Sequence, residues 1–215
     1  MPAHINVKIC GVTRDADIAA VAEAGGRYIG LNFFPKSPRY VTYDQAVDLM
    51  AAVPDRVQNV ALVVNADDEA IRTLIDTAGP DILQLHGSET PERVAEVKAR
   101  FGLPVMKAIG IATASDLPQI DAYGAVADYL LIDAKPPKGA DRPGGNAVTF
   151  DWTLLAGRDI PLPWLLAGGL VPGNVAEAIQ RTGAGQVDVS SGVESAPGIK
   201  DHDLVHAFIK AAHAA

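Results

Sequence analysis

The sequence predicts an α/β fold closed into a barrel of eight parallel strands, and three patterns predict it. Short runs rich in Val, Ile, Leu and aromatic residues recur along the whole chain, and each is followed by a stretch of helical character. The runs are apolar almost throughout, which is typical of parallel strands covered by helices. Eight such units in 215 residues favour one (β/α)8 TIM barrel over an open sheet, with residues 1–215 as a single catalytic domain.

The expected elements alternate in order along the chain. The expected strands are Ile5–Cys10, Tyr28–Phe33, Val57–Val64, Asp81–His86, Val105–Ile109, Ala127–Asp133, Pro163–Ala167 and Gln186–Ser190. Alanine-rich segments predict the helices Asp15–Ala24, Tyr43–Ala52, Asp67–Ala78, Pro91–Arg100, Pro172–Thr182 and Asp201–Ala212. Two more helices are expected to be weak, because Ala114–Tyr123 contains Pro118 and Phe150–Ala156 is barely two turns long.

Composition restricts the possible classes of protein. Hydrophobic residues make up 48% and charged residues 20%, as in an ordinary globular chain, and no apolar run is long enough to cross a bilayer. We therefore expect a cytoplasmic protein with no membrane partner. The net charge of -8 argues against nucleic acid as a partner, but backbone N–H groups can still bind a small anion.

The ends of the strands are where a barrel of this class carries its chemistry. Cys10, the only cysteine, ends the first expected strand, His86 the fourth and Asp133 the sixth, while Arg39 follows the second. The Pro- and Gly-rich segment 135–145 is expected to be an active-site loop after the sixth strand.

A glycine-containing pair of residues follows each of the last two strands. Gly168 and Gly169 come after the seventh strand, and Ser191 and Gly192 come after the eighth. Each pair alone fits a tight turn as well as it fits a ligand site. Together, at neighbouring strand ends, they favour a phosphate site built from free N–H groups.

A series of motifs in this order resembles the phosphoribosylanthranilate isomerase family. The motifs are Lys8-Ile9-Cys10-Gly11-Val12-Thr13, Phe34-Pro35-Lys36-Ser37-Pro38-Arg39-Tyr40, Gln84-Leu85-His86-Gly87, Leu131-Ile132-Asp133, Thr149-Phe150-Asp151-Trp152, Ala167-Gly168-Gly169-Leu170 and Asp188-Val189-Ser190-Ser191-Gly192-Val193-Glu194. One departure is the long loop after the sixth strand, with Gly144-Gly145-Asn146-Ala147 where many members have a compact glycine-rich turn.

The resemblance implies an enzyme of tryptophan biosynthesis that needs no cofactor. It would convert N-(5-phosphoribosyl)anthranilate into 1-(2-carboxyphenylamino)-1-deoxyribulose 5-phosphate by an Amadori rearrangement. Cys10 would be the general base and Asp133 the general acid. Arg39 would bind the anthranilate carboxylate, Asp188 the substrate amino group, and the two glycine loops the phosphate. We expect a monomer or a homodimer.

These roles require unusual protonation states. A free Asp titrates near pH 3.9 and a free Cys near 8.5, so inverting the pair spans about 4.6 pH units, or roughly 6 kcal/mol. Because alternate residues of a strand share a face, Lys8 and Asp188 should form an ion pair near Cys10, either as a site feature or as plain core stabilisation. We expect the activity to have two pH limbs that belong to the coupled pair.

Other assignments are weaker. A phosphosugar isomerase of the histidine pathway does similar chemistry with aspartates at strands one and five, where this chain has Cys10 and Ile109-Gly110. A phosphate-binding barrel without catalysis would lack the acid or the base, and nothing in the chain suggests a scaffold that acts through its surfaces. No metal site is expected from the spacing of the Cys and His residues, and His86 is expected to support the site rather than to catalyse.

Overall fold

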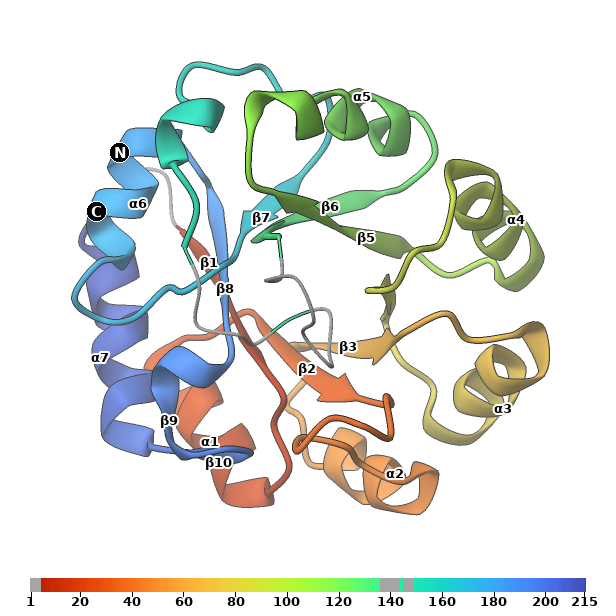
Figure 1. Ribbon diagram of the computed structural model, residues 1–215. Coiled ribbons are helices and arrows are strands. Elements are labelled where there is room, and N and C mark those ends of the chain that lie inside the picture. Colours follow the sequence, from red (N-terminus) through yellow and green to blue (C-terminus); the bar gives the residue numbers. More distant parts are fainter. Residues whose placement is uncertain (1–4, 136–143, 145–148) are drawn as a thin grey trace.

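The computed structural model describes residues 5–135, 144 and 149–215. Its eight parallel strands form a closed barrel in chain order, β1 to β8, which confirms the predicted fold (Figure 1). Within the described residues, an α-helix follows every strand of the barrel except β6, and these helices surround the barrel. The strands are β1 (Asn6–Cys10), β2 (Tyr28–Asn32), β3 (Gln58–Val63), β4 (Ile82–Leu85), β5 (Val105–Ile111), β6 (Tyr129–Ala134), β7 (Trp164–Leu166) and β8 (Gln186–Val189).

The helices begin where side chains can bond the first free N–H groups. Thr42, Asp67, Thr90 and Asp201 each accept such a bond at a helix start. The α-helices are α1 (Asp15–Ala24), α2 (Tyr43–Ala51), α3 (Asp68–Ala78), α4 (Pro91–Phe101), α5 (Pro118–Gly124), α6 (Val175–Thr182) and α7 (His202–His213).

Three local expectations are corrected. The segment Ala114–Tyr123 divides at Leu117 into a 3-10 turn, η1 (Ala114–Asp116), and α5, because Pro118 has no N–H and begins a new helix. The helix expected at Phe150–Ala156 is only a 3-10 turn, η2 (Trp152–Leu155). The helix expected from Pro172 begins at Val175, since the Asn174 side chain closes a turn onto the N–H of Val171.

A hairpin that the sequence did not predict follows β8. The chain makes a 3-10 turn, η3 (Ser191–Val193), and then pairs β9 (Glu194–Ala196) with β10 (Ile199–Lys200) in antiparallel fashion. Of the loop expected after β6, Lys135 and Gly144 are described; Gly145, Asn146 and Ala147 lie outside the described residues.

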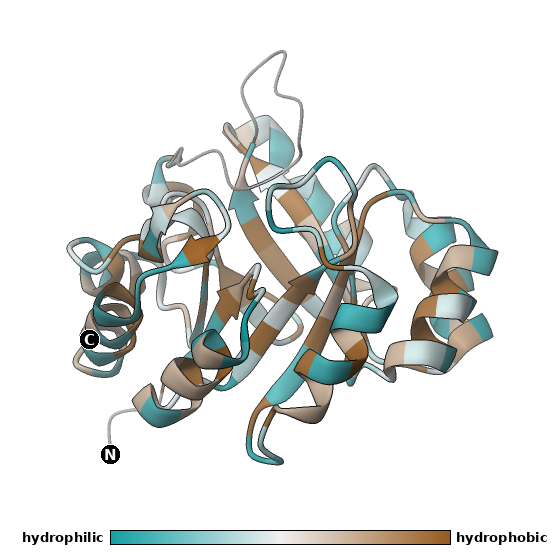
Figure 2. Cartoon of the chain, turned by 90° about the horizontal axis from the view of Figure 1, so that it is seen from below, coloured by the Kyte–Doolittle hydropathy of each residue, from teal (hydrophilic) through white to brown (hydrophobic). Residues whose placement is uncertain are grey.

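The barrel has two apolar regions separated by its strands. Residues that point outward pack under the helices, and a second set fills the interior: Tyr28, Val60, Ile82, Met106, Ala108, Leu131, Leu165 and Ala167. The side view shows this apolar band along the strands (Figure 2). Above the interior plug, at the carboxyl ends of the strands, polar side chains replace apolar ones.

Candidate active site

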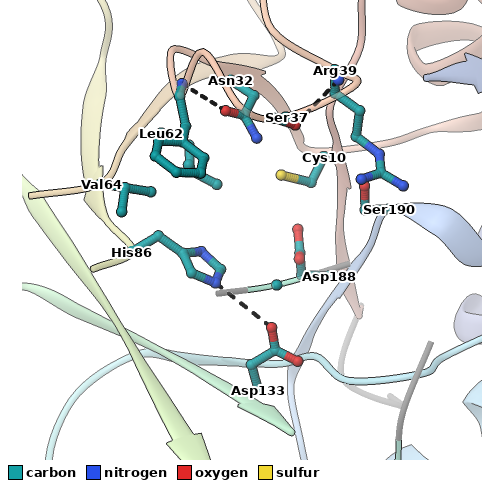
Figure 3. Close-up of a pocket in the computed structure, with 12 residues that line it drawn as sticks. Cys10, Asn32, Ser37, Arg39, Leu62, Val64, His86, Asp133, Asp188 and Ser190 are labelled. Atoms are coloured by element: carbon teal, nitrogen blue, oxygen red, sulfur yellow. Dashed lines mark hydrogen bonds and ion pairs between the residues drawn. The ribbon is translucent and has the colours of Figure 1, made fainter. Parts of the chain in front are cut away.

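A pocket opens at the carboxyl ends of the strands. Its lining comes from the ends of β1, β2, β3, β4, β6 and β8 and from the loops that follow them (Figure 3). The lining residues are Cys10, Asn32, Phe34, Ser37, Arg39, Leu62, Val64, His86, Asp133, Gly144, Asp188 and Ser190. The structure therefore brings together four residues that the sequence singled out separately, namely Cys10, Arg39, Asp133 and Asp188.

Cys10 lies beside a buried ion pair. Lys8 Nζ donates to Asp188 Oδ1 at 2.8 Å, which confirms the pair expected from strand parity. The pair forms because Lys8 of β1 and Asp188 of β8 are register partners where the barrel closes. The Lys8 side chain is fully buried, so the Asp188 carboxylate is its compensating charge.

The protonation of Cys10 is set by opposing effects. Burial raises the pKa of the Cys10 thiol above its ordinary value, because a thiolate loses its hydration there. The cations Lys8 and Lys200 lower that pKa and Asp188 raises it, but burial is the largest influence. The effect of the two lysines on the Cys10 pKa is therefore smaller than the effect of burial in the free protein.

Asp133 lies across the pocket from Cys10, on β6 (Figure 3). Its Oδ1 accepts the N–H of Ala134 at 2.7 Å, and its Oδ2 is 3.7 Å from His86 Nε2. The other ring nitrogen of His86, Nδ1, is 2.8 Å from the Gln84 side-chain amide. Such an amide donating to Nδ1 leaves the proton of a neutral ring on Nε2, facing Asp133.

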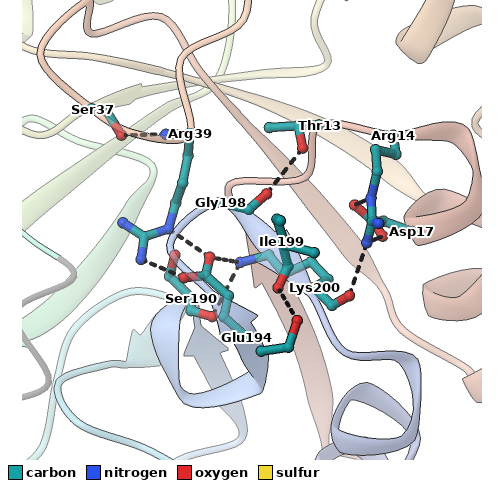
Figure 4. A network of polar contacts seen from close by, with 11 residues as sticks. Thr13, Arg14, Asp17, Ser37, Arg39, Ser190, Glu194, Gly198, Ile199 and Lys200 are labelled. Carbon is teal, nitrogen blue, oxygen red and sulfur yellow. Dashed lines mark hydrogen bonds and ion pairs between the residues drawn. The ribbon is translucent and has the colours of Figure 1, made fainter.

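Arg39 has a protein carboxylate as its partner. Its Nε and Nη2 donate to the two carboxylate oxygens of Glu194, both at 2.7 Å (Figure 4). Lys200 Nζ donates to the same carboxylate at 2.7 Å. Burial alone would raise the pKa of Glu194, but the bonds from Arg39 and Lys200 outweigh it and leave that pKa below its ordinary value.

Sequence reasoning missed Glu194 as a partner and Lys200 altogether. Glu194 belongs to the motif quoted above, but nothing in its spacing connects it with Arg39, which is 155 residues away in the chain. Lys200 lies in a two-residue strand that has no periodic signal. The sequence offers one hint of Lys200: it is a charged residue in the short connection between the eighth strand and the last helix.

The two glycine loops lie against each other. Gly168 and Gly169 both have positive φ, 92° and 62°, which turns the chain sharply after β7. A Cβ on Gly192 would collide with the carbonyl of Leu170, so the two loops can touch only because Gly192 has no side chain. The structure thus gathers Gly168, Gly169, Ser191 and Gly192 at one edge of the barrel mouth.

The described residues contain neither a cluster suited to a metal ion nor a helix that could cross a membrane. No group of three or more His, Cys, Asp or Glu side chains in the described ranges is arranged to hold a metal ion. No helix within these ranges has the length and apolar character needed to span a membrane.

The family model, a curated relative and solved structures point to the same family over nearly the whole chain. The family model for N-(5'phosphoribosyl)anthranilate (PRA) isomerase matches residues 7–211. A Paracoccus denitrificans protein named N-(5'-phosphoribosyl)anthranilate isomerase is 60% identical over 210 residues, covering 98% of each chain. The crystal structure of phosphoribosyl anthranilate isomerase from Thermotoga maritima has a TM-score of 0.88 at 36% identity, covering 98% of this chain and 100% of that one.

A further solved structure of this enzyme holds a ligand. It is a complex of phosphoribosyl anthranilate isomerase with reduced 1-(o-carboxyphenylamino)-1-deoxyribulose 5-phosphate, and it matches with a TM-score of 0.86 at 34% identity, covering 98% of this chain and 100% of that one. The match of the family model, the identity over nearly the full length and the shared barrel agree. The chain therefore belongs to the N-(5'-phosphoribosyl)anthranilate isomerase family and is an isomerase of tryptophan biosynthesis.

Proposed function

We propose that this chain converts N-(5-phosphoribosyl)anthranilate into 1-(2-carboxyphenylamino)-1-deoxyribulose 5-phosphate, with Cys10 as general base and Asp133 as general acid. The observation that carries this proposal is the position of the two side chains, which line one pocket from opposite sides (Figure 3). A substrate between them would have an acid on one face and a base on the other.

The rearrangement needs one proton donor and one proton acceptor. Asp133 would protonate the ring oxygen, so that the C1–O bond breaks and the nitrogen lone pair forms a Schiff base. Cys10 would then remove the proton from C2′, and the C–H electron pair would form the enolamine, which relaxes to the ketone. Atoms and electrons balance without an external oxidant or a cofactor.

The remaining site residues would bind the substrate. The two glycine loops offer N–H groups and close approach to the phosphate, through Gly168, Gly169, Ser191 and Gly192. Asp188 would face the substrate amino group. Arg39 would bind the anthranilate carboxylate through Nη1, because Glu194 already occupies Nε and Nη2. The two parallel hydrogen bonds that an arginine can give one carboxylate are thus already made to Glu194.

The test follows loss of the fluorescence of phosphoribosylanthranilate. Cys10→Ser and Asp133→Asn should each lower kcat by about 10²- to 10⁴-fold, the usual contribution of a positioned acid or base. Asp76→Asn makes the same chemical change on the exposed surface of α3 and should leave kcat unchanged. Near-normal turnover in either Cys10→Ser or Asp133→Asn would refute the role assigned to that residue.

A further inference from the structure

Near the pocket of Cys10 lies a buried set of three charged side chains, of which the proposed function uses only Arg39. We call Arg39, Glu194 and Lys200 the Glu194 cluster (Figure 4). Its side chains are almost completely enclosed, with 6% of Arg39, 4% of Glu194 and 0% of Lys200 exposed. Both cations donate to one carboxylate, Arg39 with two bonds and Lys200 with one.

The charges of the cluster do not cancel. Two cations share one carboxylate, so without bound substrate the ionised cluster has one more positive than negative charge. The neighbouring pair of Lys8 and Asp188 is neutral as a unit and does not supply the missing anion. A buried charge without a counter-charge is costly, so the cluster favours an anion in the adjoining pocket.

The charged and titratable groups around Cys10 come from several elements. Lys8 on the same strand, Asp188 from β8 and Lys200 from β10 act on its charge, and Arg39, His86 and Asp133 line the same pocket. Lys8 has Asp188 as its own carboxylate. Lys200 has only a share of Glu194, whose two oxygens both also bind Arg39.

Lys200 is held firmly in this position. Its Nζ also donates to the carbonyl of Ser190 at 3.1 Å, and its own carbonyl accepts from Arg14 Nη2 at 2.8 Å. The hydroxyl of Thr13 donates to the carbonyl of Gly198 at 3.1 Å and so fixes the turn of the same hairpin. The ammonium group is therefore held against Glu194 and against Ser190, which lines the pocket, as long as the hairpin stays docked.

We propose that Lys200, held in place by Glu194, is a positioning residue that stabilises the thiolate of Cys10. This inference rests on the proposed role of Cys10 as the base. Burial disfavours the negative charge of a thiolate, and the positive charge of Lys200 would compensate it. In the free protein, the Cys10 thiolate would be the anion that the Glu194 cluster lacks. In agreement, the charge of Lys200 acts on the Cys10 pKa in the lowering direction.

The test measures Cys10 directly. Because the chain has one cysteine, its alkylation by iodoacetamide reports this thiol alone. The pH dependence of the alkylation rate gives the thiol pKa without any substrate. Lys200→Met should raise that pKa by about one pH unit, so that alkylation at neutral pH slows about tenfold. The limb of the kcat/KM profile that reports the base should move in the same direction.

Further variants separate charge from packing. Lys200→Gln keeps a donor for Glu194 and Ser190 but removes the charge, so it should behave like Lys200→Met and serves if that variant does not fold. Lys200→Arg restores the charge and should return the thiol pKa toward that of the wild type. Lys210→Met removes an exposed lysine of α7 and should leave the thiol pKa unchanged.

The outcomes distinguish this inference from the proposed function. An unchanged thiol pKa in the folded neutral variants of Lys200, or an equal shift in Lys210→Met, would overturn the role of Lys200 and leave Cys10 as the base. Normal turnover of Cys10→Ser would instead overturn the base assignment, whatever the alkylation profiles show.

Discussion

The two sides of the barrel mouth differ in how charge surrounds the two groups proposed for catalysis. On the side of β8, β1 and β2, Cys10 lies among five buried charged side chains in two ion clusters. On the side of β4 and β6, the contacts of Asp133 with the described residues are one backbone hydrogen bond and a histidine 3.7 Å away. A base must lose its proton and an acid must keep it, so cations belong on the first side and would be harmful on the second.

The position of Lys107 agrees with this difference between the two sides of the mouth. This lysine lies on β5, next to the strand of Asp133, but its Nζ donates to Glu89 and to the carbonyls of Leu85 and Gly87. Its neighbours Met106 and Ala108 point into the barrel, so Lys107 itself points outward. This lysine of the neighbouring strand thus anchors the loop that carries His86 and does not line the pocket.

The largest effect is expected when one charge is removed from the side of Cys10. Asp188→Asn leaves Lys8 buried without its carboxylate and should lower the free energy of unfolding by about 3–5 kcal/mol. Urea denaturation measures the change. Adding Lys8→Met should recover most of the loss, because no unpaired charge then remains. A loss below about 1 kcal/mol in Asp188→Asn would mean that this side does not depend on paired charges.

A smaller effect is expected on the opposite side. His86→Asn should lower kcat by less than tenfold, because 3.7 Å is longer than a hydrogen bond and the contact with Asp133 is loose. Steady-state kinetics beside Asp133→Asn gives the comparison. If His86→Asn were as damaging as Asp133→Asn, the two residues would act as one unit and the acid side would be as tightly organised as the base side.

The smallest effect concerns the ion pair of Lys135 and Asp116, neither of which lines the pocket. Lys135 and the N–H groups of Ala112 and Thr113 lower the pKa of Asp116 to about 2. A carboxyl whose pKa falls on folding stabilises the native state at neutral pH and loses this contribution as the pH falls from about 4 to 2.

Lys135→Met should therefore reduce the free energy of unfolding by about 1 kcal/mol at pH 7, a modest value because half of the Lys135 side chain is exposed. The difference from the wild type should shrink at pH 3. Asp116→Asn, as the matched variant, should remove the pH dependence of the difference. A deficit that stays constant between pH 7 and pH 3 would contradict the assignment to this pair.

The sequence predicts the barrel well because its signal is local. Each strand is an apolar run with its own helix, and strand parity alone places Lys8 opposite Asp188. Parity works there because β1 and β8 are fixed in register by closure of the barrel. The candidate acid and base were identified in the same way, as the last residues of strands, but their roles came from the resemblance to a family.

The environment of Arg39 could not be predicted in this way. The sequence suggests a loop arginine free to bind a carboxylate, and the structure shows one already bound to Glu194. The hairpin that carries Glu194 and Lys200 has strands of three and two residues, too short for a periodic pattern. Its position is decided by contacts with the loops after β1 and β2, such as the packing of Gly198 on Pro38.

The hairpin of β9 and β10 also has a consequence for the order in which the protein is made. The ribosome delivers Cys10 early, but β8, which closes the barrel beside it, and the hairpin that carries Glu194 and Lys200 come late in the chain. A nascent chain that ends before Glu194 has Cys10 and Arg39 but lacks the carboxylate and the ammonium group of the Glu194 cluster. The mouth of the barrel is therefore completed only after β8 and the hairpin have been synthesised.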